Sequence, residues 1–314
     1  LAPGPYDEHH KVFTGLVKWQ QQNFSLDIMT WRNFDYGLGA GIAQALDSRG
    51  KGSYHFNHYK AQYDMSEWVT GTFIGTLSYK QQKSDNFLYI FPAGTVLPIG
   101  ADGNINFVQP AGLVEFTDGL IGTPSPRGKT FTGRLTQVLN MSKQHLLRWE
   151  LGYEHQDYRT TERKNFGPSV ISGQEGMVDG TLTSVTGTDF IYLPNVSRHF
   201  YYLSLQDEWQ ASEQLQFNLG LRYDHYSDFG TSVNPRLGLI WQASRDFSMK
   251  FFAGTAFKSP SVNQLHAKNN PVALGNKQLQ PETVDTIETG LNFDYGINDN
   301  ARVSVNVFNY HAKD

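Results

Sequence analysis

The chain of 314 residues is 39% hydrophobic and 14% aromatic, with a formal net charge of −4. So small a charge gives no reason to expect a nucleic-acid partner, and the absence of cysteine excludes disulfides, thiolate metal sites and a cysteine nucleophile. No run of roughly 18 apolar residues is present to form a transmembrane helix, whereas a transmembrane β-strand needs only about ten residues of alternating hydrophobicity.

The first half of the chain alternates strand patterns with connections of very different length. Short turns are expected around Gln22, at Asp64 and over residues 140–143. Long loops are expected over residues 34–53 and 82–128, because the second range holds five prolines that would each remove a ladder donor from a strand. Strands are therefore predicted over residues 12–20, 24–33, 54–63, 67–80, 130–139 and 146–158.

The second half follows the same plan, with a long loop over residues 159–197. Its strand patterns cover residues 199–209, 215–224, 236–242, 248–258, 287–295 and 302–310. About twelve strands result, and every second connection is short. Short turns on one rim and long loops on the other are typical of outer-membrane barrels, whereas the alternative, an aromatic-rich β-sandwich, would not be expected to sort its connections in this way.

The alternation along these strands separates charged from apolar side chains. A charge at the centre of a bilayer would cost about 2–4 kcal/mol, so we expect the charged set to face a lumen. The residues predicted to face lipid are Leu219, Leu221, Leu239, Trp241, Phe251 and Leu291, and those predicted to face inward are Arg222, Arg236, Lys250 and Glu288. The sequence thus predicts an all-β fold, an antiparallel up-and-down transmembrane β-barrel with about twelve strands of a larger barrel.

Two motifs that would indicate other chemistry are explained better by loops and strands. The spacing GLGAG at residues 37–41 is similar to a phosphate-binding loop, but it follows a polar, aromatic strand and not a buried apolar one. His55 and His58 form H-x-x-H, yet three positions apart on a strand their rings point to opposite faces. No serine-hydrolase or zinc-protease motif occurs. We therefore expect no metal site, no cofactor and no enzyme activity.

Several segments together resemble the barrels of TonB-dependent outer-membrane receptors. Residues 222–230 (RYDHYSDFG) and 234–236 (NPR), followed by Trp241, are similar to conserved barrel segments of that family. Further matches are FKSP at 257–260, in which Lys258 departs from the usual arginine, KNFG at 164–167, NP at 270–271, GN at 275–276, and LQPET at 279–283 followed by Glu288.

The resemblance implies a barrel of about 22 strands with a plugged lumen, powered through the TonB protein. The resemblance implies that residues 1–314 are part of that barrel without the plug domain. A signal peptide is not expected in this sequence either, because the opening LAPGP reads as a loop. The strands near residues 12–20 and 303–310 would be edges whose partners lie outside this sequence. Outer-membrane lipid and the TonB protein, reached through the plug, are the implied partners, and the bacterial outer membrane is the implied location.

Three classes of function remain open at this point. The favoured one is active import of a scarce nutrient, with a ferric siderophore first and haem, a vitamin or a glycan as alternatives. A passive channel would need only the strand alternation, and an outer-membrane enzyme has no assembled catalytic set. We place the ligand under the loops 82–128, 159–197 and 259–276. The predicted contacts are Phe87, Tyr89 and Phe91, Arg159, Arg163 and Lys164, which could bind an anionic iron chelate, and His266, Asn269 and Asn270.

Overall fold

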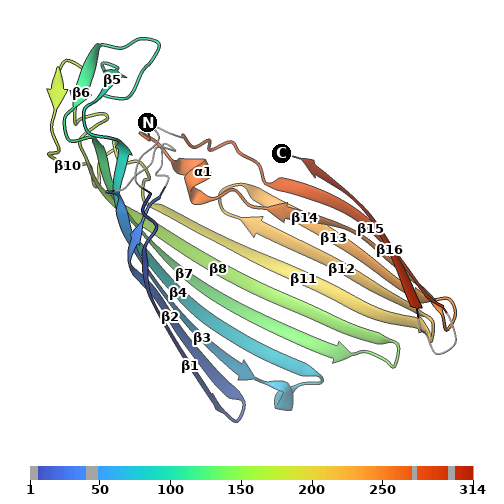
Figure 1. The fold of residues 1–314 in the computed structure, drawn as a ribbon. Helices are drawn as coiled ribbons and strands as arrows, with labels where there is room; N and C mark the ends of the chain where they lie inside the picture. The colour runs from blue at the N-terminus through green and yellow to red at the C-terminus, as the bar shows by residue number, and fades with distance from the viewer. Residues whose placement is uncertain (1–5, 40–48, 271–273, 296–300, 314) are drawn as a thin grey trace.

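One large antiparallel sheet makes up most of the computed structural model, which describes residues 6–39, 49–270, 274–295 and 301–313. Along the main path of the sheet each strand pairs with the next in chain order (Figure 1). Its strands are β1 (His10–Gln21), β2 (Phe24–Gly37), β3 (Lys51–Asp64), β4 (Thr72–Phe91), β7 (Leu120–Asn140), β8 (His145–Lys164), β11 (Val196–Ser212), β12 (Leu215–Tyr226), β13 (Gly230–Gln242), β14 (Phe247–Lys258), β15 (Glu282–Tyr295) and β16 (Ala301–Lys313). The predicted up-and-down arrangement of about twelve strands is confirmed, and β1 and β16 lie at the two ends of an open sheet.

The remaining elements are short. A second sheet contains β5 (Thr95–Ile99), β6 (Gly112–Phe116) and β9 (Met177–Val178), and β10 (Thr183–Ser184) pairs with the end of β8. The helices are the 3₁₀ turn η1 (Ser66–Trp68) and α1 (Val262–His266). Among the described residues, none of the helices has the length and apolar character that a membrane crossing requires.

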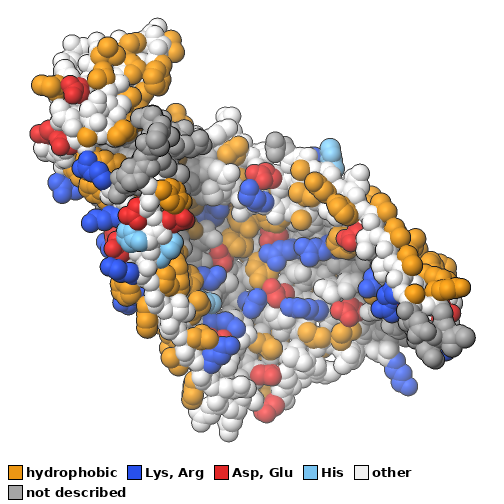
Figure 2. All heavy atoms as spheres, in the orientation of Figure 1, with side chains coloured by type: hydrophobic (Ala, Val, Ile, Leu, Met, Phe, Trp, Pro, Cys, Tyr) orange, Lys and Arg blue, Asp and Glu red, His pale blue; other side chains and the backbone are white. Residues whose placement is uncertain are grey.

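The two faces of the large sheet differ as predicted. Leu239 lies opposite Phe251, and Met249, two residues further along the strand, lies opposite Leu291, so these side chains share one face. Lys250 lies opposite Ile240, and Glu288 opposite Phe252, on the other face. Figure 2 shows charged side chains gathered in the hollowed face of the sheet, which we call the concave face. The opposite, apolar face is called the convex face below.

Ion pairs explain how the concave face holds so many charges. Lys60 Nζ lies 3.3 Å from an Asp27 carboxylate oxygen, and Arg222 donates to Asp224 at 2.7 Å. Glu150 lies 3.6 Å from Arg148 and 4.0 Å from Arg134, measured between nitrogen and oxygen atoms. Opposite charges therefore pair both along single strands and between neighbouring strands, as expected of a mixed-charge lumen wall.

Aromatic side chains form a row on the convex face near the short turns. Trp19 and Phe24 lie with ring centroids 5.6 Å apart, Phe73 and Trp149 5.9 Å apart, and the stacked rings of Trp209 and Phe217 5.2 Å apart. Such a row is the interfacial girdle of a membrane barrel. It marks the rim that carries the short turns as one membrane boundary.

Several strands, among them β2, β3, β4, β7 and β8, are longer than the sequence pattern indicates, so the predicted loops 34–53, 82–128 and 159–197 are partly wrong. β4 runs to Phe91, β7 begins at Leu120, and β8 runs to Lys164. Pro124 and Pro126 both lie inside β7. Because they are two positions apart, their missing N–H groups would point to the same neighbouring strand, so only one of the two ladders of β7 loses hydrogen bonds. The ladder to β8 is continuous across both prolines, while the ladder to β4 is interrupted between Lys83↔Arg127 and Leu88↔Gly122.

The turn at Asp64 differs from the prediction, and part of the glycine motif lies outside the described residues. The predicted tight turn at Asp64 is followed by η1, and strand β4 begins at Thr72 instead of residue 67. Asp64 carboxylate oxygens accept from the backbone of Ser66, which starts the 3₁₀ turn. In the glycine motif, Gly37 ends β2, but residues 40 and 41 are outside the described residues, as is the turn over 296–300.

The inserted segments between β4 and β7 and between β8 and β11 fold into a lobe beyond the rim that carries the long connections (Figure 1). The lobe has its own hydrophobic core, which contains Ile99, Val114 and Phe116 from β5 and β6 and Phe166 from the second insertion. β6 pairs in parallel with β9, so the two insertions share one small sheet.

Candidate ligand-binding site

A pocket of 460 Å³ lies where the concave face meets the segment that contains α1. Strands β3, β4, β7, β8 and β11 supply one wall, and residues 192–193 and 259–263 supply the rest. The side chains that give it polar character are Tyr54, Gln82, Gln156, Tyr158, Tyr192 and Arg198. Five of these come from even-numbered, concave-face positions of the strands, so the alternation of the sheet directs them into the lumen.

Gly128 creates room for two of these side chains. A Cβ at this position would lie 2.9 Å from Gln82 Nε2 and 3.0 Å from a ring carbon of Tyr158. The Tyr54 hydroxyl donates to Gln82 Oε1 at 3.2 Å, which fixes the amide between the two tyrosines. The pocket floor is thus a small polar network over a glycine.

Helix α1 closes the pocket because its start and its buried face are both secured. Ser261 and Gln264 form a capping box, in which the serine hydroxyl accepts from the Gln264 N–H and the Gln264 side chain accepts from the Ser261 N–H. Val262 and Leu265 are buried. Arg198, itself buried, donates to the Pro260 carbonyl at 2.9 Å, which ties the start of this segment to β11.

Arg198 also belongs to a second contact that holds the wall in place. Its Nε donates to Asp228 Oδ2 at 2.6 Å, and its guanidinium lies 5.7 Å from the ring centroid of Phe229. Charge-assisted bonds of this kind are strong and directional. Arg198 therefore positions three separate segments around one side of the pocket.

Lys164 joins the two loop regions above the pocket. Its side chain is fully buried, and Nζ donates to the Phe190 carbonyl at 2.9 Å and lies 3.5 Å from the Asn269 carbonyl. Glu162, 3.6 Å from Nζ, accepts from the Tyr192 N–H at 2.7 Å. Asn269 donates in turn to the Asp189 carbonyl at 2.8 Å, so residues 189–192 and 267–270 are held together.

The polar lining of the pocket consists mainly of phenols and amides, and none of the described residues that line it is acidic. Of its two arginines, Arg198 is paired with Asp228 and Arg127 stands at an odd-numbered position of β7. Burial raises the pKa of Tyr192 to about 12, so this phenol stays neutral and can donate a hydrogen bond at physiological pH. Burial also lowers the pKa of His266, with a further contribution from Lys277, so its imidazole is neutral at pH 7.

The nine residues predicted to contact ligand are distributed over three different environments. His266, Asn269 and Asn270 lie in the segment that closes the pocket, and Lys164 is buried beneath it. Phe91 packs against the lobe core. The other four, Phe87, Tyr89, Arg159 and Arg163, occupy odd-numbered positions of β4 and β8 and therefore point to the outer side of the extended strands.

Contacts within the protein already occupy several of these side chains. Arg159 pairs with Asp157 at 3.1 Å, and Arg163 donates to the Leu182 carbonyl at 3.0 Å. Arg49 stacks on the Tyr89 ring, 4.1 Å from its centroid. Ligand contact by the nine residues stays a prediction.

The phenols and the arginine that line the pocket are not among the predicted ligand contacts. Tyr54 and Tyr158 lie within predicted strands, and Arg198 lies between a predicted loop and a predicted strand. One feature of the sequence points to them: each stands at an even-numbered, concave-face position, close to the end of its strand that joins a long connection. Within the described residues, no three His, Asp or Glu side chains are arranged to hold a metal ion.

Residues 11–314 match the sequence pattern of a family described as TonB dependent receptor-like, beta-barrel. The chain belongs to this family. TonB-dependent receptors of this family are transport receptors of the outer membrane and not enzymes. The resemblance stated from the sequence motifs is therefore confirmed.

Curated relatives with detectable sequence similarity cover only part of the chain. An iron-regulated outer membrane virulence protein of Vibrio cholerae is 25% identical over 171 residues, which is 52% of this chain and 26% of the relative. The vitamin B12 transporter BtuB of Vibrio cholerae is 31% identical over 103 residues, 33% of this chain and 15% of the relative. The chain spans about a quarter or less of the length of these relatives.

Solved structures share the fold over nearly the whole chain. A mutant of the ferric enterobactin receptor PfeA of Pseudomonas aeruginosa superposes with a TM-score of 0.62 at 15% identity, covering 97% of this chain and 42% of that one. The siderophore receptor PirA of Acinetobacter baumannii gives 0.61 at 17% identity, with 97% and 43% covered. The Serratia marcescens hemophore receptor HasR, in complex with its hemophore and heme, gives 0.60 at 13% identity, with 97% and 45% covered. Identities this low establish the fold alone.

Proposed function

We propose that this chain is roughly half of the barrel of a bacterial outer-membrane receptor that imports a ferric siderophore. Energy would come from the TonB protein, through a plug domain inside the lumen. The observation that carries the proposal is the pocket on the concave face, which combines phenols, amides and arginines without a carboxylate among its described lining residues. Solved relatives that bind ferric enterobactin support the ligand class.

The chemistry of an anionic iron chelate fits this lining. Phenol and amide groups donate hydrogen bonds to chelate oxygens, and aromatic rings pack against the organic framework of the ligand. A water-filled passive channel would not need a helix fastened over one wall of its lumen by Arg198 and a capping box. The fastened segment therefore favours selective binding over free diffusion.

Haem is the second candidate, and His266 is the observation that favours it. The neutral imidazole is the form that ligates iron, and His266 stands at the end of α1 beside the pocket. Vitamin or glycan import is a third possibility, and the relative BtuB, a vitamin B12 transporter, supports the vitamin.

The test is iron-starved growth of a strain that lacks the native gene and carries the full-length receptor. Cells are supplied with individual siderophores or with haem, and uptake of radioactive iron is measured alongside growth. Tyr158→Phe removes a pocket hydroxyl, and Tyr153→Phe, on the convex face of the same strand, is the matched control. We expect siderophore uptake to fall in the first variant and to remain at the wild-type level in the second.

Two results would change the proposal. Haem-dependent growth that disappears in His266→Ala, without siderophore-dependent growth, would replace the siderophore with haem. Growth that is independent of the receptor on every iron source would exclude iron uptake and leave vitamin or glycan import.

A further inference from the structure

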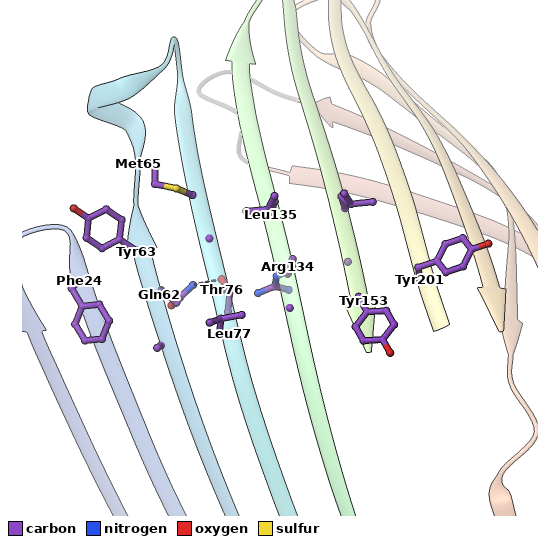
Figure 3. A pocket seen from close by; sticks show the side chains of 15 residues that line it. Phe24, Gln62, Tyr63, Met65, Thr76, Leu77, Arg134, Leu135, Tyr153 and Tyr201 are labelled. Carbon is purple, nitrogen blue, oxygen red and sulfur yellow. Dashed lines mark hydrogen bonds between the residues drawn. The ribbon is translucent and has the colours of Figure 1, made fainter. Parts of the chain in front are cut away.

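A groove of 680 Å³ crosses the convex face over strands β2, β3, β4, β7 and β8 (Figure 3). Small residues leave its floor empty: a Cβ at Gly133 would find its nearest atom, in Leu77, at 3.7 Å, and Ala61 lies beside Leu77 on the neighbouring strand. At Gly75 the nearest atom would be the flexible end of Met65, at 3.1 Å. The groove is therefore a depression in a surface that is otherwise covered by large side chains.

The groove belongs to the membrane-facing side. Phe24, Tyr63 and Gly75 face one another in register, and they share the convex face with Leu135 and Leu151. The polar lining residues Gln62, Thr76 and Arg134 occupy the intervening positions, so their side chains are directed to the concave face. Figure 3 shows Gln62 and Thr76 hydrogen-bonded to each other, at 3.2 Å.

The position of the groove along the strands selects one leaflet of the membrane. Phe24 and Met65 stand at the short-turn rim, where the Tyr63 ring lies 5.8 Å from the ring of Trp68. Short turns of outer-membrane barrels lie on the periplasmic side. The periplasmic leaflet of an outer membrane consists of phospholipids, whereas lipopolysaccharide occupies the outer leaflet.

We propose that this groove binds one acyl chain of a phospholipid from the periplasmic leaflet. A chain in the groove is contacted on its sides by aromatic and aliphatic walls as well as from below, so it buries more apolar area than a chain on a flat barrel surface. A lipid chain is the expected occupant because the groove is continuous with the convex face, which faces lipid. The inference rests on the outer-membrane placement of the sheet and is independent of the transported substrate.

Lipid retention by the full-length receptor tests this directly. The receptor is purified in mild detergent, incubated with palmitoyl-oleoyl phosphatidylethanolamine and examined by native mass spectrometry. Gly133→Leu fills the groove with four added carbon atoms, and Leu135→Ala removes a wall without adding volume. Ala253→Leu adds three carbon atoms elsewhere on the convex face, opposite Leu237, and is the control for added bulk. Folding of each variant is verified by its heat-modifiable mobility on gels.

We expect wild type and Ala253→Leu to retain one phospholipid, and both groove variants to retain about tenfold less of it. This factor corresponds to the loss of contact between the protein and about two methylene groups of the acyl chain. Equal retention by all four proteins would overturn the proposal, as would recovery of lipopolysaccharide or detergent alone at this stoichiometry. If Gly133→Leu fails to fold, Leu135→Ala alone decides. Failure of siderophore uptake would leave this result unaffected, because the measurement is retained lipid.

Discussion

The ring of Tyr202 on β11 lies directly over Gly152 on β8. A single methyl group added at Gly152 should therefore destabilise the barrel. The two residues are directly opposite in register. A Cβ at Gly152 would lie 2.3 Å from two ring carbons of Tyr202, far inside van der Waals contact. The ring cannot swing away freely, because its hydroxyl donates to Glu150 at 2.8 Å and Arg222 stacks on it at 4.0 Å from the centroid.

The expected cost of Gly152→Ala follows from two opposing effects. Overpacking costs about 1–3 kcal/mol, and removing glycine from the unfolded chain returns about 0.4–1 kcal/mol, so a net loss of about 1–2 kcal/mol is expected. The melting temperature of the full-length receptor in detergent, followed by circular dichroism, measures the effect. Gly133→Ala is the control, because its new Cβ would have no atom nearer than 3.7 Å.

A double-mutant cycle separates the ring clash from any other effect at Gly152. In a Tyr202→Leu background the flexible side chain can move aside, and Gly152→Ala should then cost little. The reasoning is refuted if Gly152→Ala melts like Gly133→Ala, or if its cost is the same with and without the tyrosine ring.

Three further outcomes are expected. Lys164→Met removes the cation beside the buried Glu162 carboxylate, which then keeps its hydrogen bond from the Tyr192 N–H but loses its ion-pair partner. A local loss of about 3–5 kcal/mol should speed hydrogen exchange in residues 165–195, while the exposed neighbour Arg163→Met should stay within about 0.5 kcal/mol; equal exchange in both variants would contradict this. The lowered pKa of His266 means that the folded protein disfavours the charged form, so its contribution to stability is present above pH 6.5 and is lost as pH falls through the folded pKa. An NMR titration midpoint at or above 6.5 would be inconsistent with that burial. Leu221→Lys should cost about 2–4 kcal/mol by placing a charge against lipid, whereas Ser204→Lys on the concave face should be tolerated; the urea midpoint of refolding into vesicles distinguishes them.

The faces of the strands could be predicted because side-chain direction is a local property of an extended backbone. Leu219 and Arg222 are assigned to opposite faces by counting alone, and the register of β12 with β13 agrees. Strand ends could not be predicted in this way. From the sequence alone, Pro124 indicates the end of a strand. Whether a strand can continue through it depends on which neighbouring strand its nitrogen faces, and this is set by pairing with residues far along the chain.

The candidate site depended on the same kind of distant information. The loop motif around His266 and Asn269 is visible in the sequence, and the structure has both residues in the segment that closes the pocket, but their contact with ligand stays a prediction. Tyr54 and Tyr158 are more than one hundred residues apart and meet only after β3, β4, β7 and β8 have formed. No pattern within one strand distinguishes a pocket phenol from an ordinary lumenal one.

The parallel pairing of β6 with β9 sets an order for folding. The strands of the large sheet pair mostly with their sequence neighbours, so hairpins can be added one after another with short loops to close. The lobe is different, because β6 meets β9 only after β7 and β8 have been laid down between them. Asn165 then connects both insertions, with bonds to the carbonyls of Gly119 and Asp179 at 2.9 Å. The apolar core of the lobe is therefore shielded from water only after β7 and β8 have formed, and its first segments, β5 and β6, stay exposed during that interval.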